Sequence, residues 1–206
     1  GTVNSFYIGI IATFIATVLG TMAALGLSRP HMPYKALIMS ILISPMIVPL
    51  IITAAGMFFF YARINLVYTF TGVILAHVAL ATPFVVITVT ATLVGFDMNM
   101  VKAAQSLGAK PMRTFFKVIM PLILPGIISG ALFAFITSFD EVVIVMFMAS
   151  IDQLTIPKQM WAGIRQEISP VILCMATCLV ILSIVLLTTV ELLRRRAERL
   201  RGIKAR

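Results

Sequence analysis

The chain has 206 residues, of which 61% are hydrophobic and 11% are charged, with a mean hydropathy of +1.10 and a formal net charge of +9. This composition excludes an ordinary soluble domain, whose surface needs a total of about 25% charged residues. We therefore predict an all-α integral membrane protein.

Five apolar segments are long enough to cross the bilayer, because about 20 apolar residues in a helix span roughly 30 Å of hydrocarbon. In chain order they cover residues 6–27, 37–60, 68–94, 122–149 and 170–193. Several contain proline or glycine, at Pro45, Pro49, Pro83, Pro121, Pro125, Gly126 and Gly130. We expect helices to bend or to meet there, since neighbouring helices can bond the freed backbone groups.

Neutral polar side chains mark two of these spans. The first carries small and hydroxyl residues along one face, at Thr13, Thr17, Gly20 and Thr21. This face predicts close helix packing, with substrate contact as the alternative. The third span contains His77. We expect its imidazole to hydrogen-bond a neighbouring helix, because no chain of partners for a proton relay is visible.

Residues 95–121 form a basic amphipathic segment between the third and fourth spans. Apolar side chains recur at helical spacing in both halves, first at Met100, Ala103, Ala104 and Leu107, then at Met112, Phe115, Phe116 and Ile119. Gly108 separates the halves and is a helix stop signal. Two short helices are predicted, and two roles stay open: a docking surface for another protein, or a helix lying flat at anionic headgroups.

Asp140 and Glu141 are adjacent carboxylates inside the apolar run of residues 132–149. On a continuous helix Asp140 lies about 22 Å beyond Pro125, in the outer half of the membrane. Charged groups there are costly unless they face water or a partner, so we predict that they line a polar pathway. Phe135 and Phe139 would offer ring faces to an alkylammonium. In the alternative, one carboxylate caps a helix or pairs with a partner subunit.

Residues 155–168 predict a short outer helix, because Pro157 lies near its start and apolar residues follow at helical spacing. We expect it to face a delivering protein or to close the pathway, with Lys158, Trp161 and Arg165 as the contact residues. Trp161 is alternatively an interfacial anchor. In the last span, Cys174 and Cys178 have neither metal-site nor disulfide spacing and are expected to act as small apolar residues.

Basic residues in the connections predict the orientation. If residues 95–121 are cytoplasmic, that side holds thirteen of the sixteen Lys and Arg, including those of the tail at 194–206. Only Arg63, Lys158 and Arg165 remain outside. The tail is then a juxtamembrane anchor at anionic lipid and not a nucleic-acid site. Gly1 would lie outside, and residues 1–4 would be the end of an outer loop.

The sequence lacks the common motifs of membrane enzymes. It contains no G-x-x-x-x-G-K-[ST], no H-E-x-x-H and no G-x-S-x-G, and His and Cys do not cluster. Without the first motif the chain has no usual means of holding ATP phosphates. We therefore expect no enzyme activity, no cofactor and no metal in this chain, and an energy source in another subunit.

Residues 103–121 match the spacing of a known signature, Glu-Ala-Ala, three residues, Gly, nine residues, Ile-x-Leu-Pro. The matching residues are Ala103, Ala104, Gly108 and Pro121, with the conservative Val118 and Met120. The segment resembles the cytoplasmic loop of permease subunits in binding-protein-dependent type I ABC importers. Lys102 stands where that family usually has Glu, so any ion pair of that Glu with the ATPase does not carry over.

The resemblance covers essentially all 206 residues and is strongest to the polyamine-type permeases. Three segments carry it: HVALATPFVVITVTATLVGFD, SFDEVV and LTIPKQMWAGIRQEISP. It implies a six-helix fold in the bacterial inner membrane, of which five helices are visible and a first precedes Gly1. It also implies contact with an ATPase at Lys102, Ala103, Ala104, Gly108, Ala109 and Pro121.

The resemblance further implies the partners and the mechanism. A second, similar but distinct permease subunit would complete the pathway, two cytoplasmic ABC ATPases would hold ATP and Mg²⁺, and an external solute-binding protein would load it. Import by alternating access would carry a small organic cation such as putrescine or spermidine. The alternatives are another small organic solute, amino-acid-like or phosphonate-type, or a passive channel or secondary transporter that uses Asp140 and Glu141.

Overall fold

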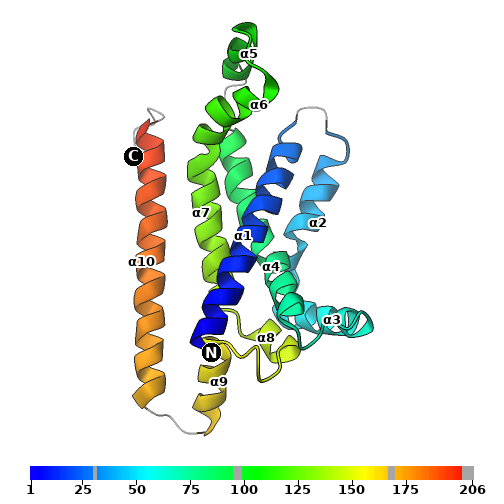
Figure 1. The fold of residues 1–206 in the computed structure, drawn as a ribbon, viewed down its shortest axis with the longest axis vertical. Coiled ribbons are helices and arrows are strands. Elements are labelled where there is room, and N and C mark those ends of the chain that lie inside the picture. The colour runs from blue at the N-terminus through cyan, green and yellow to red at the C-terminus, as the bar shows by residue number, and fades with distance from the viewer. Residues whose placement is uncertain (30–31, 95–98, 167–169, 201–206) are drawn as a thin grey trace.

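The computed structural model describes residues 1–29, 32–94, 99–166 and 170–200, and within these ranges every regular element is a helix (Figure 1). Three long helices pack together as the core bundle: α1 (Thr2–Leu27), α4 (Phe70–Val94) and α7 (Met120–Phe139). Their contact faces hold the buried apolar side chains, among them Ile8, Val85 and Ile123. α1 and α4 match the first and third predicted apolar segments to within a few residues. The helix already begins at Thr2, so the prediction of a loop at residues 1–4 is wrong for all but Gly1.

The core bundle is closest at glycines. A Cβ atom on Gly20 of α1 would lie 2.6 Å from Val85 Cβ, and one on Gly130 of α7 would lie 2.9 Å from Val85 Cα. A Cβ on Gly126 would meet the Thr92 side chain of α4. Small residues therefore let the three backbones approach at one level, as expected for helices that pack in lipid.

The second predicted span, residues 37–60, is not one straight helix. It is broken into α2 (Lys35–Ile47) and α3 (Leu50–Arg63), which meet at an angle of 104°. Val48 is extended and Pro49 precedes the first turn of α3, so the chain turns at the proline. α2 runs along the bundle, whereas α3 lies across its end (Figure 1).

The fourth predicted span, residues 122–149, differs from the structure at both ends. It begins earlier, because α6 (Pro111–Thr114) and the π-helical turn η1 (Phe115–Ile119) continue into α7 as one apolar segment over Pro111–Phe139. It also ends earlier. The helix stops at Phe139, and after Asp140–Val142 the short helix α8 (Val143–Met148) follows.

The last part of the chain returns along the bundle. α9 (Ile156–Gln166) is the predicted outer helix, and α10 (Pro170–Leu200) is the last span extended into the basic tail. Over Ile172–Thr189 none of the residues is buried inside the chain, although α10 packs on α7. Among the described residues four helices are long and apolar enough to cross a membrane, or five if the bent pair α2 and α3 counts as one span.

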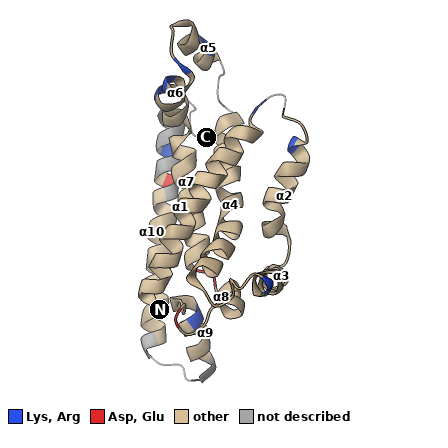
Figure 2. Cartoon of the chain, turned by 45° about the vertical axis from the view of Figure 1, so that its right-hand side comes forward, with Lys and Arg blue, Asp and Glu red and all other residues tan. Residues whose placement is uncertain are grey.

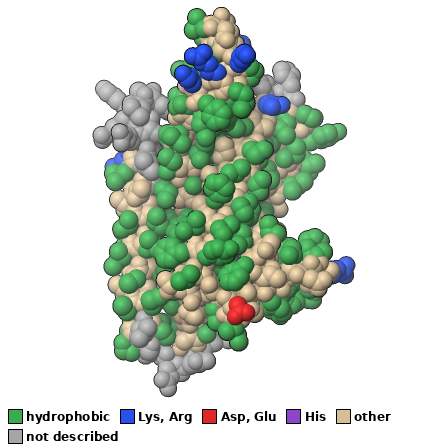
Figure 3. All heavy atoms as spheres, viewed as in Figure 1, with side chains coloured by type: hydrophobic (Ala, Val, Ile, Leu, Met, Phe, Trp, Pro, Cys, Tyr) green, Lys and Arg blue, Asp and Glu red, His purple; other side chains and the backbone are tan. Residues whose placement is uncertain are grey.

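The two ends of the bundle differ in charge. α5 (Asn99–Ser106) and α6 lie at one end with the start of α2, and α3, α8 and α9 lie at the other (Figure 1). Basic residues are more numerous at the α5 end (Figure 2), and apolar side chains cover most of the face shown in Figure 3. Gly1 lies at the end opposite α5 (Figure 1), as the predicted topology requires.

Candidate functional sites at the two ends of the bundle

The first candidate site is the segment from α5 to η1, which we call the projecting segment. α5 ends in a full Schellman motif: Gly108 has φ +81°, its N–H donates to Gln105 O at 2.9 Å, and Ala109 N–H donates to Ala104 O at 3.1 Å. The predicted stop at Gly108 is confirmed. Only glycine adopts this backbone conformation without strain, so the turn that aims the next helix depends on it.

The apolar stripe of α5 faces outward. Leu107 is 89% exposed and Met100 is 50% exposed, while Ala104 turns toward α6. α5 also lies beyond the ends of the long helices (Figure 1). An exposed apolar stripe of this kind is typical of a surface that interacts with another protein or with a membrane.

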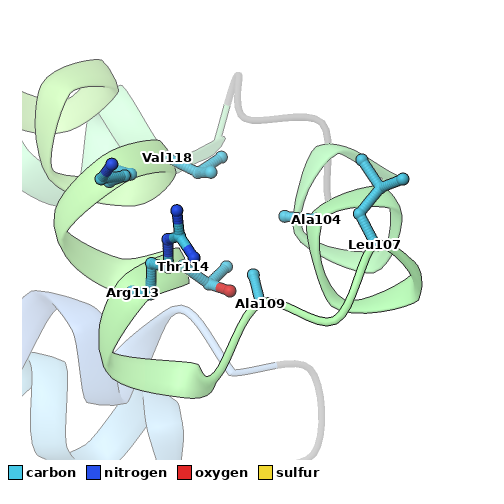
Figure 4. A pocket seen from close by; sticks show the side chains of 7 residues that line it. Ala104, Leu107, Ala109, Arg113, Thr114 and Val118 are labelled. Carbon is cyan, nitrogen blue, oxygen red and sulfur yellow. The ribbon is translucent and has the colours of Figure 1, made fainter.

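A cleft separates α5 from α6 and η1 (Figure 4). Its lining is Ala104, Leu107, Ala109, Arg113, Thr114, Lys117 and Val118. Arg113, Thr114 and Val118 project from one wall toward Ala104 on the other. The sequence analysis named Ala104 and Ala109 as coupling residues but not Arg113, Lys117 or Val118. Arg113 and Lys117 are four residues apart, and this spacing is the sequence signal that could have placed both cations on one helix face.

The remaining coupling residues named from the sequence are spread around this cleft. Lys102 and Ala103 are exposed on α5. Pro121 lies at the first turn of α7, just after η1, and is therefore outside the cleft lining.

The second candidate site is the break between α7 and α8. The sequence analysis placed the two carboxylates on a continuous helix. In the structure they lie instead in the turn that follows Phe139. Asp140 is exposed, whereas Glu141 is 6% exposed and accepts a hydrogen bond from Ile144 N–H at 2.8 Å. Glu141 thus caps the N-terminus of α8, which was the alternative role considered for one of the pair.

The C-terminus of α8 is bonded by the opposite charge. Lys158 of α9 donates from Nζ to Val145 O at 3.1 Å and to Ala149 O at 3.0 Å. Burial lowers the pKa of the Lys158 amine, because desolvation penalises its charged form. An anion at the N-terminus and a cation at the C-terminus both complement the helix dipole. A helix of six residues is therefore held at both ends by side chains of flanking segments.

The aromatic residues predicted for the pathway form a cluster with α1. Phe135 and Phe139 stack with ring centroids 5.2 Å apart, and Phe6 meets Phe139 edge-on at 5.0 Å. Phe139 is only 6% exposed. Ring packing accounts for these contacts, and the role of the rings in binding a cation stays a prediction.

Polar side chains link several elements at the end of the bundle opposite α5. His77 of α4 and Ser138 of α7 are hydrogen-bonded between Nδ1 and Oγ at 2.7 Å, and both are buried. The predicted bond of His77 to a neighbouring helix is thus confirmed. Asn4 of α1 donates to Leu154 O at 3.0 Å, and Ser5 Oγ accepts from Ile156 N–H at 2.8 Å. These bonds attach the start of α9 to the start of α1.

α9 presents part of its surface outward. Trp161 is 47% exposed and Ile164 is 52% exposed. The side chain of Arg165, the third residue predicted to contact a delivering protein, lies outside the described residues. Lys158 differs from the prediction in that its amine bonds α8, so its contact with another protein stays untested.

Together these features define a class, a helical membrane protein with a projecting segment at one end and a polar break at the other. The match to the binding-protein-dependent transport system inner membrane component covers residues 16–199. The chain belongs to this family and is an inner-membrane permease subunit, not itself a catalytic enzyme.

Curated relatives agree with this assignment. The chain is 29% identical over 194 residues to the spermidine/putrescine transport system permease protein PotC of Haemophilus influenzae, covering 94% of this chain and 76% of that one. It is 30% identical over 180 residues to the putrescine transport system permease protein PotI of Escherichia coli, covering 84% and 64%. It is 32% identical over 148 residues to the trehalose transport system permease protein SugB of Mycobacterium tuberculosis, covering 72% and 54%.

Solved structures share the fold. An inward-facing MetNI methionine ABC transporter is similar with a TM-score of 0.66 at 19% identity, over 98% of this chain and 94% of that one. An amino acid ABC transporter solved with histidines gives a TM-score of 0.68 at 19% identity, over 95% and 92%. The predicted type I ABC importer permease fold is confirmed.

Proposed function

We propose that this chain is the permease subunit of an ATP-driven importer and that its projecting segment couples it to a cytoplasmic ATPase. The observation that carries the proposal is the geometry of α5. The helix lies beyond the ends of the long helices (Figure 1), and two apolar residues of its stripe, Met100 and Leu107, are 50% and 89% exposed. An amphipathic helix lying in the headgroup layer would instead lie level with the ends of the long helices, with its apolar stripe turned into the bilayer.

The partners follow from the family. A second permease subunit completes the pathway, two ABC ATPases hold ATP and Mg²⁺, and an extracytoplasmic binding protein delivers the substrate to the end that carries α9. The α5 end and the tail after α10 are then cytoplasmic, in keeping with the excess of Lys and Arg there. ATP-driven closure of the two ATPases moves the projecting segments together, and the rigid bundle passes this motion to the outer end.

The substrate is a small organic cation, and a polyamine fits best. Both PotC and PotI carry putrescine in their names, and their similarity extends over most of this chain. Asp140, the exposed carboxylate at the outer break, suits an incoming alkylammonium. The trehalose relative matches a smaller share of the chain, 72%, which makes a sugar the weaker assignment.

The coupling role is tested at Gly108. Gly108→Trp places a bulky side chain in the Schellman turn, where φ +81° also disfavours any side chain. We expect the variant to insert and pair normally but to lose ATPase binding and ATP-dependent uptake. Gly26→Trp is the matched control, because Gly26 also has open space around it and lies in the last turn of α1. Normal ATP-dependent uptake by the Gly108 variant would refute the coupling assignment.

A further inference from the structure

All charged side chains of the projecting segment are positive. Residues 99–121 contain Lys102, Lys110, Arg113 and Lys117 and no Asp or Glu. All four side chains are exposed, and none has an ion pair with a described acidic residue. We call these four residues the cationic cluster. Figure 3 shows blue side chains gathered at this tip of the molecule.

The cluster surrounds a cleft with apolar walls. Ala104 and Ala109 line one side, Val118 lines the other, and Arg113 and Lys117 stand along the α6 and η1 wall (Figure 4). Thr114, 2% exposed, forms part of the lining and bonds back to Lys110 O. An acidic side chain entering the cleft would lay its methylenes on alanine and valine and its carboxylate against two cations.

We propose that the ATPase groove that receives this permease is acidic, and that an Asp or Glu of the ATPase enters the cleft between α5 and α6 and binds Arg113 and Lys117. This rests on the coupling role proposed above and adds the chemistry of the partner surface. Charge complementarity carries it: four cations without an acidic neighbour repel one another and any cationic groove. Lys102 extends the same positive surface along α5.

Anionic lipid is the competing occupant of a basic cluster. Its position argues against it, because α5 lies beyond the ends of α1, α2 and α10 along the long axis of the molecule (Figure 1). The cleft also opens between two helices of the projecting segment, and lipid-facing side chains of the long helices are not part of its lining. A folded partner reaches such a cleft more readily than a headgroup does.

The test is the affinity of the assembled permease pair for its ATPase, measured in detergent with Arg113→Glu and Lys117→Glu. Each reversal sets like charges against the acidic groove, so we expect binding to weaken about tenfold or more. Arg113→Gln and Lys117→Gln, which only remove a charge, should weaken it less, and more salt should weaken wild-type binding. Arg29→Glu and Lys35→Glu are matched controls, exposed at the same end but outside the cluster.

A crosslink identifies the partner residue. A photo-crosslinking amino acid in place of Leu107, which lines the cleft and is 89% exposed, should attach to an ATPase segment that contains Asp or Glu. Changing that acid to Lys should restore binding to the Arg113→Glu permease. Failure of the reciprocal change, with the crosslink in place, would overturn the proposal.

Three other outcomes are decisive. If both reversals bind the ATPase as wild type does while Gly108→Trp does not, the acidic groove is wrong and the coupling role stands. If Gly108→Trp also binds normally, the coupling role itself is wrong. If the reversals act only in anionic-lipid nanodiscs and not in neutral lipid or detergent, the cluster binds lipid and the proposal fails.

Discussion

Asp140 and Glu141 are neighbours in sequence with opposite surroundings. Glu141 is buried and accepts a hydrogen bond from the backbone of α8, so its carboxylate already has a partner inside the chain. Asp140 is exposed, and its own backbone N–H closes the last turn of α7 by donating to Ile136 O at 3.0 Å. Of the pair, Asp140 is therefore the residue that can meet a substrate without loss of structure.

We expect Asp140→Asn to reduce uptake of putrescine at low concentration by about ten- to a hundredfold, because one charge-assisted contact is worth about 1.5–3 kcal/mol. Expression and ATPase binding should be unchanged. The measurement is uptake into vesicles over a range of substrate concentrations. Asp152→Asn is the control, since Asp152 is likewise exposed and lies in the loop before α9. Wild-type uptake by the Asp140 variant at every concentration would remove this residue from the pathway.

Gly130 shows how little room separates α4 from α7. An added Cβ would meet the Thr88 hydroxyl and lie 2.9 Å from Val85 Cα, which is backbone and cannot rotate away. Gly130→Ala should therefore destabilise the bundle by about 1–3 kcal/mol, seen as a lower melting temperature in detergent. Gly56→Ala, in open space on α3, should lower it little or not at all. Equal melting temperatures for the two variants would show that α4 and α7 can move apart at Gly130.

At the scale of elements, α8 is too short to be stable by itself, since isolated helices of fewer than about 12 residues are marginal even in good sequences. Its six residues keep their shape because Glu141 bonds the first turn and Lys158 bonds the last. α9 supplies Lys158, so the position of the outer helix and the order of α8 are linked.

Lys158→Met keeps the length of the side chain and removes both bonds to α8. We expect faster hydrogen exchange at residues 144–149, because the C-terminal carbonyls lose their donor and the dipole loses its cation. Glu141→Ala should act on the same backbone amides, and the double variant should add little to either single change if the two side chains hold one element. Lys110→Met, at the opposite end, is the control. Unchanged exchange in both single variants would mean that packing alone orders α8.

The sequence predicted the straight helices better than the broken ones. Apolar length alone located α1 and α4, and the pattern of Ala103, Ala104 and Gly108 located α5 and its stop. The end of α7 was missed because residues 132–149 contain no glycine or proline to mark it. A local signal was present, since Glu141 precedes Ile144 by three residues, the spacing at which a side chain can cap a first turn.

The bend between α2 and α3 was anticipated only as an interruption. Pro45 and Pro49 are visible in the sequence, yet proline fixes its own backbone and not the direction that the next helix takes. The 104° angle depends on packing, with α2 against α4 and α3 against α8. Arg113 and Lys117 were not assigned to a site from the sequence, because the cleft that they line forms between two elements whose mutual position the sequence does not encode locally.

At the scale of the whole molecule, the orientation in the membrane can be tested directly. The native thiols are exposed, so single cysteines should be introduced into a Cys174→Ala, Cys178→Ala background. We expect an impermeant maleimide to label Gln159→Cys from outside and Lys110→Cys only from the cytoplasmic side, because the two positions lie at opposite ends of the bundle. Labelling of both from one side would contradict the topology.

α10 differs from the other long helices in that residues 172–189 have a mean hydropathy of 2.6 and no residue buried inside the chain. A helix of this kind is stable in lipid without a neighbouring helix. In contrast, 67% of the most apolar stretch of α4 is buried, and its polar and small residues need contacts with α1 and α7. Assembly during synthesis therefore has a natural order. The core bundle can close while α10 is still leaving the ribosome, and α10 can then insert as an independent unit and dock on α7 afterwards.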